Sequence, residues 1–227
     1  MNSKFSKQLK NIAFIFFLNC GTLTLYSCDS FEEEKNMASS EKKLDTSLVR
    51  VSVGQDAYMI PMNFMTPYGD YPKEFSSKDD LMQVRLYLPE FTGYAANDSP
   101  IGKYNPDEVD VMWNAYGVGI DATSMLDRSL KFELVSRNAD ADKLDLTAYK
   151  DLVDDDATTY MSEAAHGSKV MIQCYTGGVN DICKINYFHK QKQFGIFFSF
   201  NAKYLKDWKM IDERINSMID SWKSKSS

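Results

Sequence analysis

The residues of this chain that could do chemistry are few, and the two histidines come first. A serine hydrolase needs a nucleophile, a basic imidazole and an orienting acid. His166 lies in a predicted loop, and His189 ends an apolar strand pattern just before Lys190. The sequence contains no G-x-S-x-G, no P-loop and no dinucleotide-binding glycine fingerprint after a strand. We therefore predict that both histidines lie at the surface, that the chain has no catalytic residue and no cofactor, and that it is not an enzyme.

A run of aspartates is the next candidate. Its members crowd into residues 140–156 and are Asp140, Asp142, Asp145, Asp151, Asp154, Asp155 and Asp156. The segment from Asn138 superficially resembles a calcium loop, but Lys143 stands where that loop needs glycine and Tyr149 where it needs glutamate, so no metal site is predicted. Paired carboxylates that cleave glycosides stay an open alternative. The run is by default a solvated acidic face, and its functional alternative is a docking surface for a basic partner.

The amino-terminal residues have the pattern of an export signal. Lys4, Lys7 and Lys10 precede the apolar run 12–18, which is too short and too interrupted for a good membrane-spanning helix. Leu25-Tyr26-Ser27-Cys28 resembles the bacterial lipobox, which implies that residues 1–27 are removed and that Cys28 is lipidated. An ordinary signal peptide with an incidental cysteine is the alternative. Asp29 is similar to an inner-membrane retention signal, so we expect a lipid anchor at the periplasmic face, with the inner membrane favoured over the outer.

The remaining cysteines are predicted to pair. Cys20 falls within the cleaved segment, which leaves Cys174 and Cys183 for the exported domain. Two cysteines on adjacent strands of an exported protein indicate a disulfide. A redox or metal pair is the rival interpretation, but the spacing is not C-x-x-C and no histidine lies at ligand spacing.

The net charge of the chain indicates which kinds of molecule it could bind. The full chain carries a formal charge of −6, and cleavage before Cys28 leaves 23 basic against 32 acidic residues, a charge of −9. Nucleic-acid binding needs a basic face, so no nucleic acid is expected. Such an acidic domain is repelled by anionic lipid headgroups unless a covalent anchor holds it. The acidity suggests a cationic soluble partner, with solubility alone as the alternative.

The elements that must position these residues follow from hydrophobic periodicity. Alternation predicts strands, which we place at residues 49–53, 58–60, 81–89, 109–113, 129–136, 170–174, 183–187 and 194–200. Residues 119–136 also loosely suit a helix, but the alternation of Leu130, Phe132 and Leu134 favours a strand over 129–136. Apolar residues at spacings of three and four predict an amphipathic helix over 208–222, with Asp207 as its N-cap. The expected fold is α+β, an antiparallel sheet with the C-terminal helix packed on one face. The expected organisation is a signal peptide at 1–27, a flexible tether at 28–48 and one globular domain at 49–227.

Several short motifs occur in an order that resembles a known group of proteins. They are Val51–Gly54, Tyr58–Phe64, Leu86–Tyr94, the cysteine pair and Tyr204–Ile211. In pattern, residues 49–222 look like small proteobacterial envelope lipoproteins. The C-terminal part, residues 170–222, is similar to periplasmic immunity proteins of type VI secretion.

Two functions from different classes follow. The resemblance implies a lipid-anchored immunity protein that binds and neutralises a secreted antibacterial effector, which we expect to be basic. The alternative is a non-catalytic accessory lipoprotein that binds another component of the cell envelope. A hydrolase built from carboxylates is the third hypothesis.

Overall fold

A computed structural model describes residues 45–65, 74–76, 81–94, 105–115, 121–178 and 180–224. The predicted signal peptide, Cys28, Asp29 and most of the tether lie outside these residues. No helix within the described ranges is long and apolar enough to cross a membrane.

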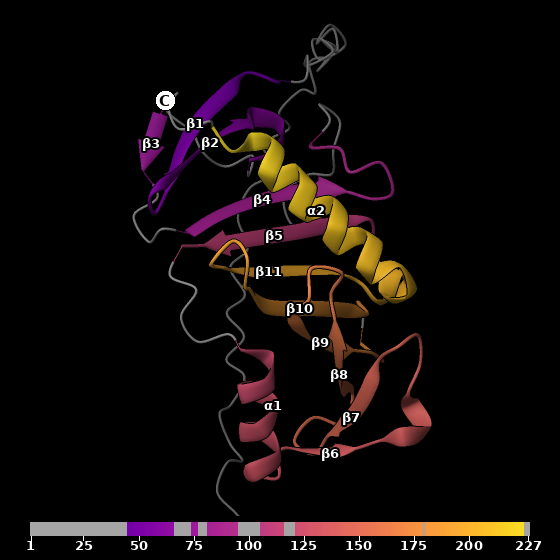
Figure 1. Cartoon of the computed structure of the whole chain (residues 1–227). Helices are drawn as coiled ribbons and strands as arrows, with labels where there is room; N and C mark the ends of the chain where they lie inside the picture. The colour runs from indigo at the N-terminus through magenta and orange to yellow at the C-terminus, as the bar shows by residue number, and fades with distance from the viewer. Residues whose placement is uncertain are drawn as a thin grey trace, which may run out of the picture. The chain divides into compact units, whose positions relative to one another are not determined.

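A large antiparallel sheet forms the centre of the fold (Figure 1). Its spatial order is β4 (Leu81–Tyr87), β5 (Glu108–Asn114), β11 (Phe194–Asn201), β10 (Ile182–His189), β9 (Lys169–Tyr175), β8 (Ala157–Glu163), β7 (Thr147–Asp151) and β6 (Val135–Arg137). The six strands from β6 to β11 form a meander in which each strand pairs with the next along the chain. The β4–β5 hairpin extends this meander through pairing of β5 with β11.

A smaller sheet holds β2 (Asp56–Pro61), β1 (Leu48–Val53) and β3 (Glu74–Ser76), with β3 parallel to β1. The turn between β1 and β2 requires glycine at position 54. Gly54 has a φ of +60°, and a Cβ there would lie 2.4 Å from the Cβ of Ala115.

The C-terminal helix α2 (Trp208–Trp222) covers one face of the large sheet, as predicted (Figure 1). Strand alternation turns Val84, Val111, Ile196 and Ile185 to a single face, and all four are buried. The buried stripe of α2, which comprises Trp208, Ile211, Ile215, Ile219 and Trp222, packs in the same core cluster. Each such side chain stabilises the fold by about 1.5–3 kcal/mol relative to leaving it in water.

Three aromatic rings join the two sheets to α2. Trp113 of β5 lies 5.6 Å from Tyr58 of β2 and 6.4 Å from Trp222, measured between ring centroids. After α2 the chain runs antiparallel to β2, where the backbone N–H of Ser224 donates to the carbonyl of Ala57 at 2.7 Å.

The predicted strand at 129–136 is wrong except at its last two residues. Residues Ala122–Lys131 form α1, and the strand β6 is limited to Val135–Arg137. Asp121 caps this helix, because its carboxylate accepts the N–H groups of Thr123 and Ser124. Because this cap starts a helix at residue 122, the backbone is already helical where the alternation of Leu130, Phe132 and Leu134 begins.

Two further differences concern caps and strands. Asp207 makes no side-chain cap bond to α2, and Asn201 instead caps the 3₁₀ turn Ala202–Asp207 that leads into this helix. The strands β7 and β8 were not predicted from the sequence. Ala148 and Tyr160 of these strands are nevertheless buried.

Candidate partner-binding surface

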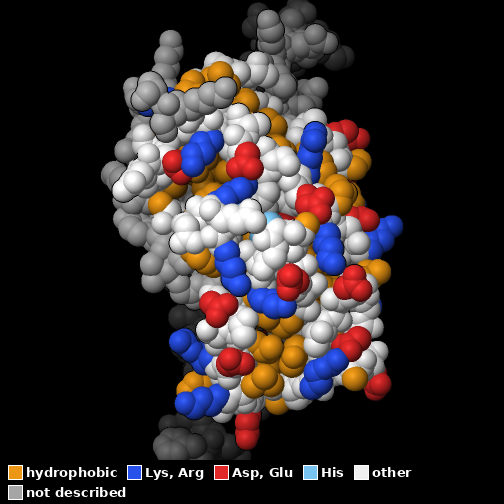
Figure 2. Space-filling view, in the orientation of Figure 1, with side chains coloured by type: hydrophobic (Ala, Val, Ile, Leu, Met, Phe, Trp, Pro, Cys, Tyr) orange, Lys and Arg blue, Asp and Glu red, His pale blue; other side chains and the backbone are white. Residues whose placement is uncertain are grey.

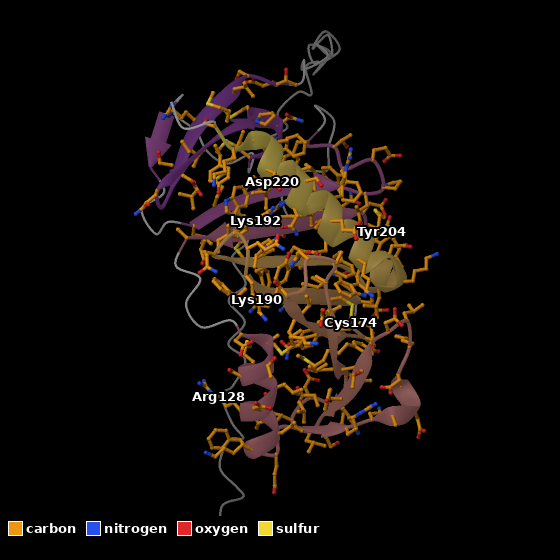
Figure 3. The ribbon with its side chains drawn as sticks, viewed as in Figure 1. Arg128, Cys174, Lys190, Lys192, Tyr204 and Asp220 are labelled. Carbon is orange, nitrogen blue, oxygen red and sulfur yellow. A yellow bond between two sulfur atoms is a disulfide. The ribbon has the colours of Figure 1, made fainter. Side chains whose placement is uncertain are left out.

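The predicted disulfide is confirmed. Cys174 of β9 and Cys183 of β10 are bonded, and they stand directly opposite each other in the register of the two strands. Both side chains are buried in the core beneath α2. Figure 3 labels Cys174 among the central strands of the large sheet. The disulfide therefore links β9 to β10 within the core, and neither cysteine offers a reactive thiol at the surface.

The prediction of two surface histidines is wrong. His189 is buried and His166 is mostly buried, and their rings stack with centroids 4.0 Å apart. The alternation Cys183, Ile185, Tyr187 continues by one more step to His189, which turns it to the α2 face. Burial lowers the pKa of His189 to about 4, and the nearby charges of His166 and Lys192 act in the same direction.

These histidines belong to a polar cluster buried between β10 and α2. The Tyr187 hydroxyl donates to Asp212 Oδ1 at 2.5 Å, and Asn216 Nδ2 donates to the Tyr187 oxygen at 2.8 Å. Burial raises the pKa of Tyr187 well above its usual value, and the Asp212 carboxylate adds to the effect. At the edge of the cluster, Lys192 Nζ lies 2.8 Å from Asp220 and bonds to Asn216 (Figure 3).

One part of this cluster has the residue types of a hydrolase triad. Ser168 Oγ lies 3.1 Å from His166 Nδ1, and His166 Nε2 lies 3.3 Å from Asp212 Oδ2. The second contact is not aligned as a hydrogen bond. Ser168 is fully buried, and its oxygen accepts the backbone N–H of Lys190. Because a substrate cannot reach this hydroxyl, the arrangement ties two turns to α2 and does not form a serine-hydrolase centre.

Two cavities at the surface of the described part are lined by charged side chains. One, of about 340 Å³, is lined by Tyr58, Trp113 and Phe194 together with Asp56 and Lys192. The other, of about 480 Å³, lies among β7, β8, β9 and the first turns of α1 and α2.

The lysines of the second cavity are engaged with carboxylates. Lys169 contacts Glu163 at 2.6 Å and Lys209 contacts Asp145 at 3.3 Å. Each lysine of this cavity is therefore paired with an acid, and neither is a free base. Among the residues that the structure describes, no three His, Cys, Asp or Glu side chains are grouped so that they could hold a metal ion.

The structure divides the predicted acidic surface in two. Asp140, Asp142 and Asp145 lie before β7, whereas Asp151, Asp154, Asp155 and Asp156 lie at its far end, in the turn to β8. The strand β7, whose last residue is Asp151, separates the groups and spans roughly 14 Å at about 3.4 Å per residue. The run is therefore not one continuous face.

Several of these aspartates have local partners. Asp142 pairs with Arg137 and also accepts the N–H of Ala148 at 2.8 Å. Asp151 Oδ1 accepts the N–H groups of Val153 and Asp154, which shapes the β7–β8 turn. Asp155 remains 91% exposed although it contacts Lys150 at 3.1 Å. The turn thus holds exposed negative charge in a defined conformation.

An exposed apolar group next to this turn was missed from the sequence. Leu130, Phe132 and Leu134 are solvent-exposed at the end of α1 and before β6, and Leu152 and Val153 are exposed in the β7–β8 turn. The backbone N–H of Leu152 donates to the carbonyl of Leu134 at 2.8 Å, which brings the two segments together. The alternation at 130, 132 and 134 was the available signal, but it had suggested a buried strand face.

The comparisons with known proteins show a similar fold, but they do not assign the chain to a family. No family model and no curated protein sequence matches the chain. The structure is similar to that of Smlt3025, an immunity protein of the Stenotrophomonas maltophilia type IV secretion system. The TM-score is 0.57 and the sequences are 16% identical, and the match covers 79% of this chain and 94% of that one.

Proposed function

We propose that this chain is a lipid-anchored immunity protein that binds and neutralises a secreted antibacterial effector at the periplasmic face of the cell envelope. The observation that carries the proposal is the likeness to an immunity protein over 79% of the chain. The acidic character of the domain and the export signal agree with it. A buried Ser168, which no substrate reaches, agrees with a role in binding rather than catalysis.

The proposal also concerns the type of secretion system that delivers the effector. The C-terminal motifs resemble immunity proteins of type VI secretion, whereas the similar structure belongs to a type IV system. For either system, we expect the effector to meet this chain in the periplasm, because the predicted export signal directs the chain there. The adjacent effector gene distinguishes the two through the cargo region that it encodes. An envelope-biogenesis operon around the gene would instead favour the accessory lipoprotein.

Protection of a sensitive cell tests the function directly. A strain without this gene is competed against a sibling that delivers the neighbouring effector, and the full-length gene is then restored. We expect the deletion strain to be killed and the restored strain to survive. Equal survival of both strains would contradict the immunity function.

Lipidation at Cys28 is tested separately. Cys28→Ala should abolish labelling with palmitate and leave an uncleaved or mislocalised precursor, because the lipobox cysteine is the acceptor. Cys20→Ala is the matched control and should leave labelling intact. Unchanged labelling of the Cys28→Ala variant would remove the anchor from the proposal.

A further inference from the structure

Exposed apolar side chains gather at one edge of the large sheet. Nine large hydrophobic residues are exposed among the described residues, and five of them form the group defined above, which we call the β6-edge patch. Phe132 is 63% exposed and Val153 is 78% exposed, and the other three lie between 41% and 52%. Figure 2 shows hydrophobic side chains at the surface of this lower part of the molecule, with charged side chains around them.

The location of the patch leaves it uncovered by the described part of the fold. β6 is the last strand of the sheet, and within the described ranges it pairs only with β7. A contiguous apolar area of this kind, rimmed by polar residues, is typical of a protein-interaction site, whereas single exposed hydrophobic residues are ordinary. The four remaining exposed residues belong to different segments of the chain, Leu48 to β1, Leu81 to β4, Leu144 to the turn before β7 and Met210 to α2.

The backbone holds the patch in its outward conformation. α1 ends in a Schellman motif, in which the N–H of Glu133 donates to the Leu130 carbonyl and the N–H of Leu134 donates to the Ser129 carbonyl. Glu133 occupies the left-handed position of this motif, with a φ of +53°, where glycine is usual. This turn breaks the alternation of Phe132 and Leu134 and leaves both side chains in solvent. The surface is thus formed before a partner arrives.

The charge around the patch is complementary to a basic partner. On the α1 side, Asp127 and Glu133 are balanced by Arg128 and Lys131. In the turn 151–156, four of six residues are aspartate and none is basic. A partner that places apolar side chains on Leu152 and Val153 would therefore meet these aspartates at the rim of the contact. Rim charges of this kind steer association.

We propose that the β6-edge patch is the surface that docks the protein partner, and that the partner presents apolar side chains within a ring of lysine or arginine. On the proposed function, on which this inference rests, that partner is the effector toxin. The patch supplies the desolvated centre of the contact, and the aspartates of the β7–β8 turn form its charged rim.

Site-specific photocross-linking in cells tests the surface. Benzoylphenylalanine replaces Phe132 or Val153 in the full-length chain, and Met210, which is exposed on α2, provides the control position. Cells under attack are irradiated and the linked protein is identified. We expect the toxin to be linked from both patch positions and not from Met210.

Binding to the toxin identified in this way completes the test. The variant with Phe132→Asp and Val153→Asp should raise the Kd by about tenfold or more, because truncation of central contacts commonly costs that much. Met210→Asp should bind as the wild type does. Thermal unfolding checks that all three chains are folded.

The outcomes separate the surface from the function. A toxin linked only from Met210, or bound unchanged by the double variant, overturns the surface and leaves the immunity function standing. An envelope protein with apolar and basic contact residues, linked from the patch in place of a toxin, refutes the immunity function and supports the surface. Linkage to a second copy of this chain, to another part of the same chain, or to nothing overturns the surface.

Discussion

The hydroxyl of Tyr187 donates a hydrogen bond to the Asp212 carboxylate at 2.5 Å in the protein interior. Tyr187 extends from β10 and Asp212 from α2, and both side chains are buried. Burial of a charged group is costly unless hydrogen bonds compensate for the lost water. The contact therefore fixes the position of α2 on the sheet more sharply than apolar packing alone would.

Removal of this hydroxyl should destabilise the fold. Tyr187→Phe keeps the ring but leaves Asp212 with one hydrogen bond fewer, so we expect a loss of about 1–3 kcal/mol in the free energy of unfolding. Urea denaturation measures this loss. Tyr175→Phe, on the partly exposed face of β9, is the control and should change stability by less than about 0.5 kcal/mol. Equal effects of the two variants would argue against the buried bond.

Removal of the disulfide should also destabilise the fold. The loop between Cys174 and Cys183 is short, and closure of about ten residues is worth roughly 2.5–3 kcal/mol in the chain-entropy model. We expect Cys174→Ser to lower the free energy of unfolding by about 2–5 kcal/mol. Reductant should weaken the wild type and have no further effect on the variant. Two freely alkylated thiols in peptides from periplasmic material would show that the bond does not form in cells.

His189 should make stability depend on pH. Its pKa is about 4 in the folded chain, below the ordinary value of 6.5, so between these values the unfolded chain binds a proton that the folded chain does not. Stability should fall as the pH falls from 6.5 towards 4, by an amount on the order of 2 kcal/mol from this residue. His189→Gln should reduce the difference between unfolding free energies at pH 7 and pH 4.5. An unchanged difference would assign the acid sensitivity to other groups.

Glycine at position 133 should stabilise the chain. Glu133 has a φ of +53°, and a side chain in the left-handed region costs about 1 kcal/mol that glycine avoids. Glu133→Gly should therefore raise the free energy of unfolding by roughly 0.5–1 kcal/mol. Glu133→Ala removes the same charge but keeps a Cβ, and should give no gain. Thermal or urea unfolding of the two variants separates backbone strain from charge.

Neutralisation of the β7–β8 turn should slow association with a basic partner. The combined change of Asp154, Asp155 and Asp156 to Asn keeps acceptor oxygens for the turn, in which Asp154 accepts the N–H of Asp156. The on-rate for the proposed toxin partner should fall by about tenfold at low salt and become less sensitive to salt. Binding kinetics at two salt concentrations measure both effects.

The first half of the aspartate run supplies the control. Asp140→Asn with Asp145→Asn removes charge before β7, away from the patch, and should change the on-rate much less. Wild-type kinetics of the triple variant, with full protection from killing, would assign the turn to solubility alone.

Local periodicity determined much of this protein. The alternation in 81–89, 170–174, 183–187 and 194–200 predicted strands that the structure contains, and the three-and-four spacing in 208–222 predicted α2. The cysteine pair could be predicted because both residues lie on alternating strands that a short turn joins. These features depend on neighbours close in sequence, so a single sequence carries them.

Only the tertiary structure decided where the remaining side chains lie. His189 follows the same alternation as Tyr187, but its burial depends on α2, which packs over it from more than 18 residues further along the chain. Leu130, Phe132 and Leu134 have the composition of a buried strand, and a cap at Asp121 together with the turn at Glu133 exposes them instead. The aspartate run is divided because β7 passes through it. Burial is a property of contacts between distant segments, and hydrophobic pattern alone does not specify which segment covers which.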